Sequence, residues 1–257
     1  MNLFRPLVAR LKNFLGAVVR EQIDEVIKYR LADTQFALHA RALFDSARFI
    51  EEHIPLSKNF TPSELRQRGL ELAPKHGLVL EFGVWKGLWI NRIATMAGER
   101  LVYGFDSFEG LPEPWCVYEP GYLKVDSLPA VRANVQLVKG WFHDTLPKFL
   151  AEHPEPVAFV HVDCDLYSST KTVLDHLRPR LQRGTVLILD DFFMTPGWQR
   201  DEFRAWFDFV AAHPEITWEY IGYQRHYGSV GVRITEISDL VEQTWSPATQ
   251  YDGDGRS

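Results

Sequence analysis

Short apolar runs of strand length alternate with segments of helical periodicity between residues 78 and 190. A parallel sheet needs this alternation, because each parallel pair of strands is joined by a crossover, which is usually a helix. The pattern therefore predicts an α/β fold with a doubly wound, mostly parallel sheet. The five strands that it predicts span residues 78–83, 101–106, 135–140, 157–163 and 185–190.

The helical segments predicted within and after this region span residues 88–97, 127–132, 145–151, 168–180 and 198–213. Two further strand-like runs, 217–222 and 229–234, have no helical segment between them. Two strands joined by a short connection pair in antiparallel fashion, so we expect them to form an antiparallel pair at one edge of the sheet. The predicted sheet thus has seven strands.

The N-terminal region lacks this alternation and shows helical patterns only. Residues 3–30 place apolar side chains three or four apart, which predicts one amphipathic helix, and residues 36–54 predict a second. A third helix is expected to begin with Thr61 as its cap and Pro62 in its first turn. We therefore expect an N-terminal helical extension over residues 1–60 that serves as a lid or in oligomerisation, a Rossmann-like domain over 61–240 and a flexible tail over 241–257.

Charge and cysteine content limit the partners and the compartment. The formal net charge is -6, with both signs interspersed, so we expect no nucleic-acid partner. The chain has two cysteines and no N-terminal leader pattern, which favours a cytoplasmic location. No run reaches the roughly 18 apolar residues of a membrane span. The basic residues among the first twenty fit packing on the same domain or on a second copy better than contact with anionic lipid, and we expect a homo-oligomer.

Polar residues at the ends of the first strands form the first candidate site, because ligands of such sheets bind beyond the carboxyl ends of the strands. Glu81 precedes Gly83 and Gly87, whose lack of a side chain lets a backbone approach a ligand, while the carboxylate can accept hydrogen bonds from a cationic amino group. The dinucleotide pattern Gly-x-Gly-x-x-Gly is absent, which disfavours a nicotinamide dehydrogenase. A plain strand-to-helix turn is the alternative interpretation.

The second and third strands end in residues suited to a nucleoside. Asp106 follows the glycines by about twenty residues, at the position where a carboxylate accepts the hydroxyls of a ribose. After the third strand, Trp141 and Phe142 offer aromatic faces that could enclose an adenine ring. Trp141 is equally well explained as a core residue.

Four carboxylates follow the fourth and fifth strands: Asp163, Asp165, Asp190 and Asp191. Like charges crowded at neighbouring strand ends raise each other's pKa, so a site that keeps them ionised needs a cation, and oxygen ligands favour Mg²⁺. Strand alternation points Asp163 and Asp165 to one side and Cys164 to the other, where it would be a buried packing residue. Helix capping and loop solvation are the alternative for Asp190 and Asp191.

Three segments in this order resemble the macrocin O-methyltransferase family, over roughly residues 78 to 205. The resemblance implies a class I, Rossmann-like methyltransferase that uses S-adenosyl-L-methionine and Mg²⁺ and acts on deoxysugar hydroxyls of macrolide and aminocoumarin antibiotics. The segments are Glu81-Phe82-Gly83-Val84-Trp85-Lys86-Gly87, Phe105-Asp106-Ser107-Phe108-Glu109-Gly110-Leu111-Pro112 and His161-Val162-Asp163-Cys164-Asp165-Leu166-Tyr167-Ser168-Ser169-Thr170.

The resemblance also assigns roles to residues. It implies Asp163, Asp190 and Asp191 as metal ligands and Asp165 as the general base. The family usually has a second glycine directly after the position of Gly87, where this chain has Leu88. Together with neighbours in the same strand-end segments, the implied cofactor-binding residues are Glu81, Gly83, Val84, Trp85, Gly87, Asp106, Ser107, Gly140, Trp141 and Phe142.

The expected function is O-methylation of a hydroxyl on a sugar or a glycosylated natural product. A catechol-type methyltransferase that acts on a phenolic acceptor is the nearest alternative, and a cofactor-binding module without turnover is the alternative from another class. Residues 113–125 carry no motif that would identify the acceptor. Candidate side chains for a sugar site are Tyr167, Trp198, His226 and Tyr227, and packing explains each of them at least as well.

Overall fold

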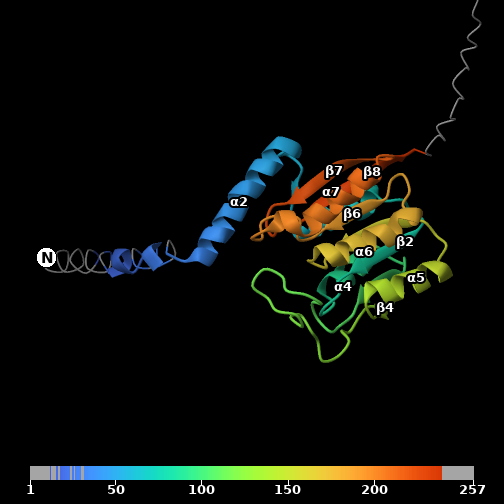
Figure 1. The fold of residues 1–257 in the computed structure, drawn as a ribbon, viewed down its shortest axis with the longest axis horizontal. Coiled ribbons are helices and arrows are strands. Elements are labelled where there is room, and N and C mark those ends of the chain that lie inside the picture. The colour runs from blue at the N-terminus through green and yellow to red at the C-terminus, as the bar shows by residue number, and fades with distance from the viewer. Residues whose placement is uncertain are drawn as a thin grey trace, which may run out of the picture.

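The chain folds around one mixed sheet of eight strands in the order β1-β7-β8-β6-β5-β2-β3-β4 (Figure 1). The computed structural model describes residues 32–238 and, before them, residues 12, 16, 18–23, 25 and 27–29. The strands are β1 (Asn59–Phe60), β2 (Leu78–Phe82), β3 (Val102–Asp106), β4 (Val135–Lys139), β5 (Val157–Val162), β6 (Val186–Leu189), β7 (Ile216–Gln224) and β8 (Val230–Ile237).

The predicted strand pattern is confirmed, with one addition. All neighbouring strands run parallel except β8, which is antiparallel to both β6 and β7. The predicted count of seven strands is wrong by one, because β1 pairs with β7 through Asn59 and Phe60. Two residues are too few to show a period-two pattern, so the sequence gives no signal for this strand.

Helices cover both faces of the sheet. On one face lie α3 (Pro62–Leu72) and α4 (Leu88–Met96), and on the other α5 (Phe142–Glu152), α6 (Tyr167–Leu177) and α7 (Glu202–Ala212) pack side by side. Short 3-10 turns follow α6 and precede α7, at Arg178–Arg180 and Trp198–Arg200. Alternation along β5 sends Val160 and Val162 into the core beneath α5 to α7, and Phe159 into the core beneath α3 and α4.

The helix α2 (Thr34–His53) precedes the sheet and confirms the predicted second helix. Its first residues project away from the sheet in Figure 1, whereas its C-terminal half packs on the main body. Phe49 contacts Phe193 and Trp198, with ring centroids 5.9 Å apart in both cases. Of the helix predicted over residues 3–30, the described positions are helical, and the others lie outside the described residues.

The start of α3 confirms the predicted capping signal. The Thr61 hydroxyl accepts from the backbone N–H of Glu64, and the Glu64 carboxylate accepts from the backbone N–H of Thr61. Two donors that a helix start would otherwise leave without partners are thereby satisfied. Pro62 occupies the first helical position, where its missing N–H costs nothing.

The helix predicted over residues 127–132 is wrong, since this segment is irregular. Pro129 lacks a donor and restricts the residue before it to extended conformations. The Asn91 side chain holds the segment instead. Its Nδ2 donates to the carbonyl of Ala130 over 3.0 Å, and its Oδ1 accepts from the N–H of Arg132 over 2.9 Å.

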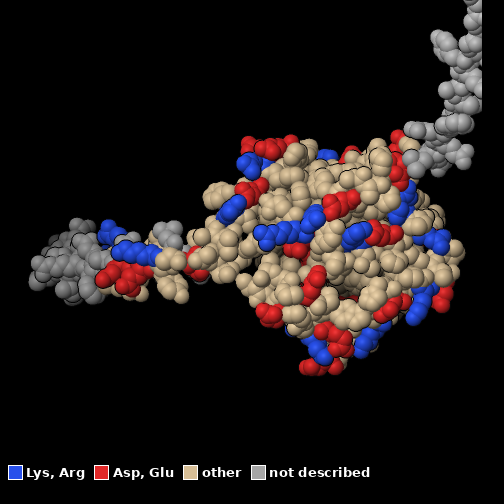
Figure 2. All heavy atoms as spheres, viewed as in Figure 1, with Lys and Arg blue, Asp and Glu red and all other residues tan. Residues whose placement is uncertain are grey.

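Basic and acidic side chains are interspersed over the face shown in Figure 2, so neither sign forms a continuous stripe on the part of that face that is described. Among the described residues, none of the helices combines the length and the apolar character needed to cross a bilayer.

Candidate functional site

A cavity of about 550 Å³ opens at the carboxyl ends of β2, β3, β4 and β5. Eight of the ten predicted cofactor residues line it, while Gly87 and Gly140 do not. Gly87 instead starts α4 in a left-handed conformation, and Gly140 adopts φ +139° directly after β4. The eight are Glu81, Gly83, Val84, Trp85, Asp106, Ser107, Trp141 and Phe142.

Gly83 brings the turn after β2 against the end of β5. Its φ is +91°, and a Cβ added there would lie 1.7 Å from the carbonyl oxygen of Asp163. No other residue fits both the conformation and the space. The turn after β2, which lines the cavity, is therefore in direct backbone contact with Asp163.

Asp106 fastens the same turn from the end of β3. Its Oδ2 accepts from the backbone N–H groups of Val84 and Trp85, at 2.8 and 2.7 Å, and its Oδ1 accepts from Phe108 at 2.7 Å. A carboxylate has about four acceptor positions, so about one is left for a hydroxyl group in the cavity. Asp106 thus shapes the turn in addition to lining the cavity.

Trp141 and Phe142 begin α5 at the end of β4, with Trp141 at the cap position. Both side chains are half-buried and line the cavity. The Phe142 ring stands edge-on to Phe82, with centroids 5.3 Å apart. This contact anchors one aromatic side chain while leaving an aromatic wall on the cavity.

Three of the four strand-end acids converge. Each of Asp163, Asp165 and Asp191 offers a carboxylate oxygen, and these oxygens lie within 4.8 Å of one another. Asp163 and Asp165 also line the cavity. Burial raises the pKa of all three, that of Asp165 to about 8. An all-carboxylate donor set of this kind suits a hard divalent cation, which would remove the cost of holding the ionised forms together.

The predicted burial of Cys164 is confirmed, but not by strand alternation, because β5 ends at Val162 and Cys164 also lines the cavity. Its side chain is buried in the core under α6, with Sγ 3.4 Å from the hydroxyl of Thr170. Asp165 itself has a left-handed backbone, with φ +63°, so the chain bends sharply directly after Cys164. The bend lets Asp165 lie beside Asp163 rather than continue away from it.

Asp190 has a different environment from the other three acids. Its Oδ1 accepts from the Ser229 hydroxyl at 2.5 Å and forms an ion pair with Arg66. Burial opposes ionisation, but the Arg66 guanidinium, His161 and the Ser229 hydroxyl together outweigh it and hold the pKa of Asp190 below its ordinary range. The structure therefore gathers Asp163, Asp165 and Asp191, and turns one oxygen of Asp190 toward an internal cation.

Arg66 is a site residue that sequence reasoning missed. It is fully buried in α3 and donates to His161, Gln224 and the carbonyl of Pro62 in addition to Asp190. The Trp89 ring, at the position where Leu88 and Trp89 depart from the family pattern, covers the guanidinium at 3.9 Å. The only sequence signal is its position beside Leu65 on the buried stripe of α3.

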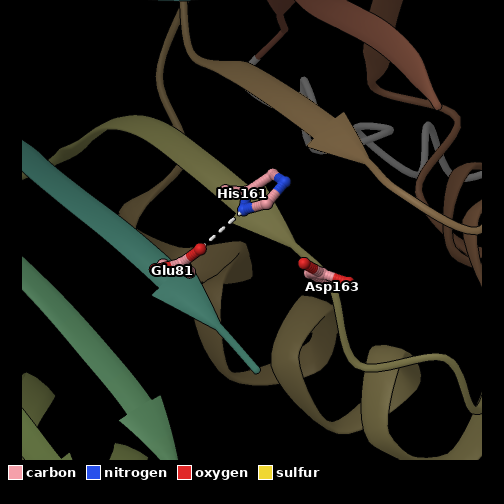
Figure 3. Close-up of side chains that lie close together, drawn as sticks. All are labelled: Glu81, His161 and Asp163. Atoms are coloured by element: carbon pink, nitrogen blue, oxygen red, sulfur yellow. Dashed lines mark hydrogen bonds and ion pairs between the residues drawn. The ribbon is translucent and has the colours of Figure 1, made fainter. Parts of the chain in front are cut away.

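Glu81 and His161 form a buried pair between β2 and β5 (Figure 3). The Nδ1–H of His161 donates to Glu81 Oε1 over 2.9 Å, and Nε2 accepts from Arg66 Nη2 over 2.9 Å. Both ring nitrogens are thus engaged, so the nearby Asp163 does not share a metal with this histidine. Glu81 Oε2 is buried without a partner in the part of the chain that is described, and Glu81 lines the cavity.

The four candidate sugar-site residues are not brought together. Trp198 is buried among aromatic core residues, and Tyr227 is exposed. Tyr167 donates to Asp208 over 2.9 Å, on the outer face of α6 and α7. Neither these three residues nor His226 lines the cavity.

Known methyltransferases are similar to this chain in sequence. The chain is 33% identical over 141 residues to 8-demethyl-8-(2,3-dimethoxy-alpha-L-rhamnosyl)-tetracenomycin-C 4'-O-methyltransferase of Streptomyces olivaceus, covering 45% of this chain and 53% of that protein. It is 31% identical over 165 residues to demethyldecarbamoylnovobiocin O-methyltransferase of Streptomyces niveus, covering 51% and 60%. The chain thus spans little more than half the length of these curated relatives.

A solved calicheamicin methyltransferase has the same fold, with a TM-score of 0.52 and 25% identity over 66% of this chain and 76% of that one. The family model described as macrocin-O-methyltransferase (TylF) matches residues 73–219. This match covers more than half of the chain and includes the turn after β2, Asp106 and the strand-end acids. The chain belongs to the macrocin-O-methyltransferase family.

Proposed function

We propose that this chain transfers a methyl group from S-adenosyl-L-methionine to a hydroxyl of a sugar or a glycosylated natural product. Mg²⁺ would bind at the acid cluster, which consists of Asp163, Asp165 and Asp191. The observation that carries the proposal is that Asp163 and Asp165 line the same cavity as the turn after β2 and the aromatic wall of α5. The names of the two curated relatives, which specify O-methylation of a rhamnosyl-tetracenomycin and of demethyldecarbamoylnovobiocin, support the acceptor class.

The cavity offers matching groups for the amino group, the ribose and the adenine ring of the cofactor, which when bound supplies an electrophilic methyl group on its sulfonium. Glu81 Oε2, buried without a partner among the described residues, would accept from the cationic amino group. The remaining acceptor position of Asp106 would take a ribose hydroxyl. Trp141 and Phe142 would hold the adenine ring between them and the glycine turn.

Asp163 and Asp191 of the acid cluster would hold the metal, and the Oδ2 of Asp190, which lies outside the cluster, would join them, because the described contacts of Asp190 use Oδ1. When bound, Mg²⁺ lowers the pKa of an acceptor hydroxyl by stabilising its alkoxide. Asp165 lies beside Asp163 on the cavity and would receive the proton of that hydroxyl at its carboxylate. The cavity walls would fix acceptor and cofactor in line for transfer.

The test is turnover with methyl-labelled S-adenosyl-L-methionine and the full chain, followed by mass spectrometry. The acceptor panel contains rhamnosyl and other deoxysugar glycosides alongside simple catechols, each with Mg²⁺ and after exhaustive chelation. We expect label on the glycosides and none after chelation. Turnover of catechols alone would favour the phenolic alternative. Cofactor binding without label on any acceptor would favour a binding module.

A further inference from the structure

The two backbone amides that directly follow the last sheet hydrogen bonds of β5 and β6 lie next to each other. The last rungs of the ladder are the bonds from Asp163 N to the Phe82 carbonyl and from Asp190 N to the Val162 carbonyl, each 2.8 Å. The next amide in each segment is that of Cys164 and that of Asp191. Among the described residues, neither amide has a backbone acceptor on a neighbouring strand, and a buried amide without an acceptor is costly.

One side chain satisfies both amides. Glu202 is fully buried at the first position of α7, and its Oε1 accepts from Cys164 N over 3.3 Å while its Oε2 accepts from Asp191 N over 3.2 Å. The two amides flank the acids of the cluster, because Cys164 separates Asp163 from Asp165. A single carboxylate therefore connects the segment that carries two of the acids to the segment that carries the third.

Glu202 is placed by features remote from the strand ends. Its helix is anchored by Ala205, Trp206 and Phe209, which are buried against the sheet. Glu202 thus reaches the cluster from a fixed helix rather than from a loop.

We propose that Glu202 is a positioning residue, which sets the separation between Asp191 and the Asp163–Asp165 pair by holding the backbone of both segments. An electrostatic effect on the cluster would need only an acidic side chain near it. The two hydrogen bonds to the amides of Cys164 and Asp191 also require a carboxylate of this length. Substitutions that keep either the charge or the length separate these two effects. The proposal relies on the proposed function only where metal affinity is measured.

The experiment compares the full-length wild type with Glu202→Ala, Glu202→Gln and Glu202→Asp, and with Glu152→Gln as a control at an exposed position of α5. Amide hydrogen exchange of the metal-free proteins is followed by NMR at Cys164 and Asp191. We expect exchange to be about tenfold faster at both amides in Glu202→Ala. In Glu202→Gln we expect faster exchange at only one of the two backbone amides, because the glutamine side chain keeps one acceptor oxygen.

The second measurement is Mn²⁺ affinity by electron paramagnetic resonance, with Mn²⁺ as the probe for a hard divalent cation. Glu202→Asp and Glu202→Gln should both bind about tenfold more weakly than wild type, and the control should not. Wild-type affinity in Glu202→Asp would overturn the positioning role, because charge alone would then suffice.

Unchanged exchange at both amides in folded Glu202→Gln and Glu202→Ala would also overturn the proposal. If Glu202→Ala does not fold, Glu202→Gln and Glu202→Asp decide. Accelerated exchange in a protein whose wild type binds no Mn²⁺ would support the backbone tie and contradict the metal site. Failure of the Glu202 positioning role and failure of the proposed metal site therefore give different results.

Discussion

At the β2–β3 end of the sheet, three backbone N–H groups surround the carboxylate of Asp106, whereas at the β5–β6 end the carboxylates of Asp163, Asp165 and Asp191 face one another within 4.8 Å. The first carboxylate is stabilised by fixed dipoles of its own fold. Burial raises the pKa of each of the other three. The Asp106 carboxylate is thus stabilised by the fold itself, whereas the three acids at the other end form a donor set suited to a cation.

Asp190 lies between these two cases. It belongs to the β6 end of the sheet, yet Arg66 neutralises it from within the fold. Comparing it with its neighbour Asp191 shows that adjacent acids can be stabilised in separate ways, one by an internal guanidinium and the other through the shared cluster.

Substitution Asp165→Asn should lower kcat by about 10²–10⁴-fold, the usual contribution of a general base. The amide keeps the size of the side chain but cannot take a proton. Cofactor affinity, measured by calorimetry, should stay within about twofold, because the fold and the other cavity walls are retained. Asp175→Asn on the exposed face of α6 is the control. Full activity in Asp165→Asn would assign the base to another residue.

Substitution Arg66→Met should lower the free energy of unfolding by about 3–5 kcal/mol, as is usual when one partner of a buried ion pair is removed. Asp190 and His161 would both lose their cationic neighbour. Urea denaturation measures the change. Arg68→Met on the same helix is the matched control, since Arg68 is exposed, and we expect a loss below about 0.5 kcal/mol there. Equal losses in both variants would contradict the internal-cation role.

Substitution Asp106→Asn should weaken cofactor binding by about tenfold, or about 1.4 kcal/mol. An asparagine side chain offers one acceptor oxygen, so the turn after β2 would lose part of its support. Calorimetry with S-adenosylhomocysteine measures the effect, and Asp126→Asn in the exposed loop is the control. Unchanged affinity would mean that the turn keeps its shape without the carboxylate.

The acid cluster should make the metal-free protein less stable as the pH rises. Native Asp165 keeps its proton up to a pKa of about 8, whereas an unfolded aspartate loses it near its ordinary value of about 3.9. Between these values the native state binds more protons than the unfolded state, so stability falls with increasing pH. We expect Tm to drop by several °C between about pH 5 and pH 8, because a chain of this length loses about 2–4 °C of Tm per kcal/mol.

Added Mg²⁺ should restore Tm mainly at the alkaline end of this range, because it binds the ionised cluster. Differential scanning calorimetry with Mg²⁺ or chelator measures both effects. Asp165→Asn should flatten the decrease, since one of the titrating carboxyls is gone. A metal-free Tm that rises over this range, or a Mg²⁺ effect that is equal at both ends, would contradict the cluster as the source.

Much of the fold could be predicted because its signals are local. The five central strands and the antiparallel β7–β8 pair follow from apolar runs, and α3 begins at the capping box predicted by Thr61 and Pro62. The failures have local causes too. Pro129 prevents the helix expected around it, and β1 is too short to produce a pattern.

The candidate site was only partly predictable from the sequence. Acids at strand ends are visible in the sequence because the carboxyl ends of parallel strands share one edge of the sheet. Eight predicted cofactor residues line one cavity on this basis. The four aromatic and histidine candidates for the sugar site fail, because residue type alone does not distinguish a core side chain such as Trp198 from a ligand contact.

The order of the strands along the chain, the strand-end acids and the glycine turn are visible in the sequence, since each depends on a run of neighbouring residues. Which acids converge, and what stabilises them, depends on how distant segments pack. Arg66 and Asp190 are 124 positions apart, and Glu202 reaches Cys164 across 38. Such contacts form only when separate elements pack, and a spacing pattern in the sequence does not encode which pairs will meet.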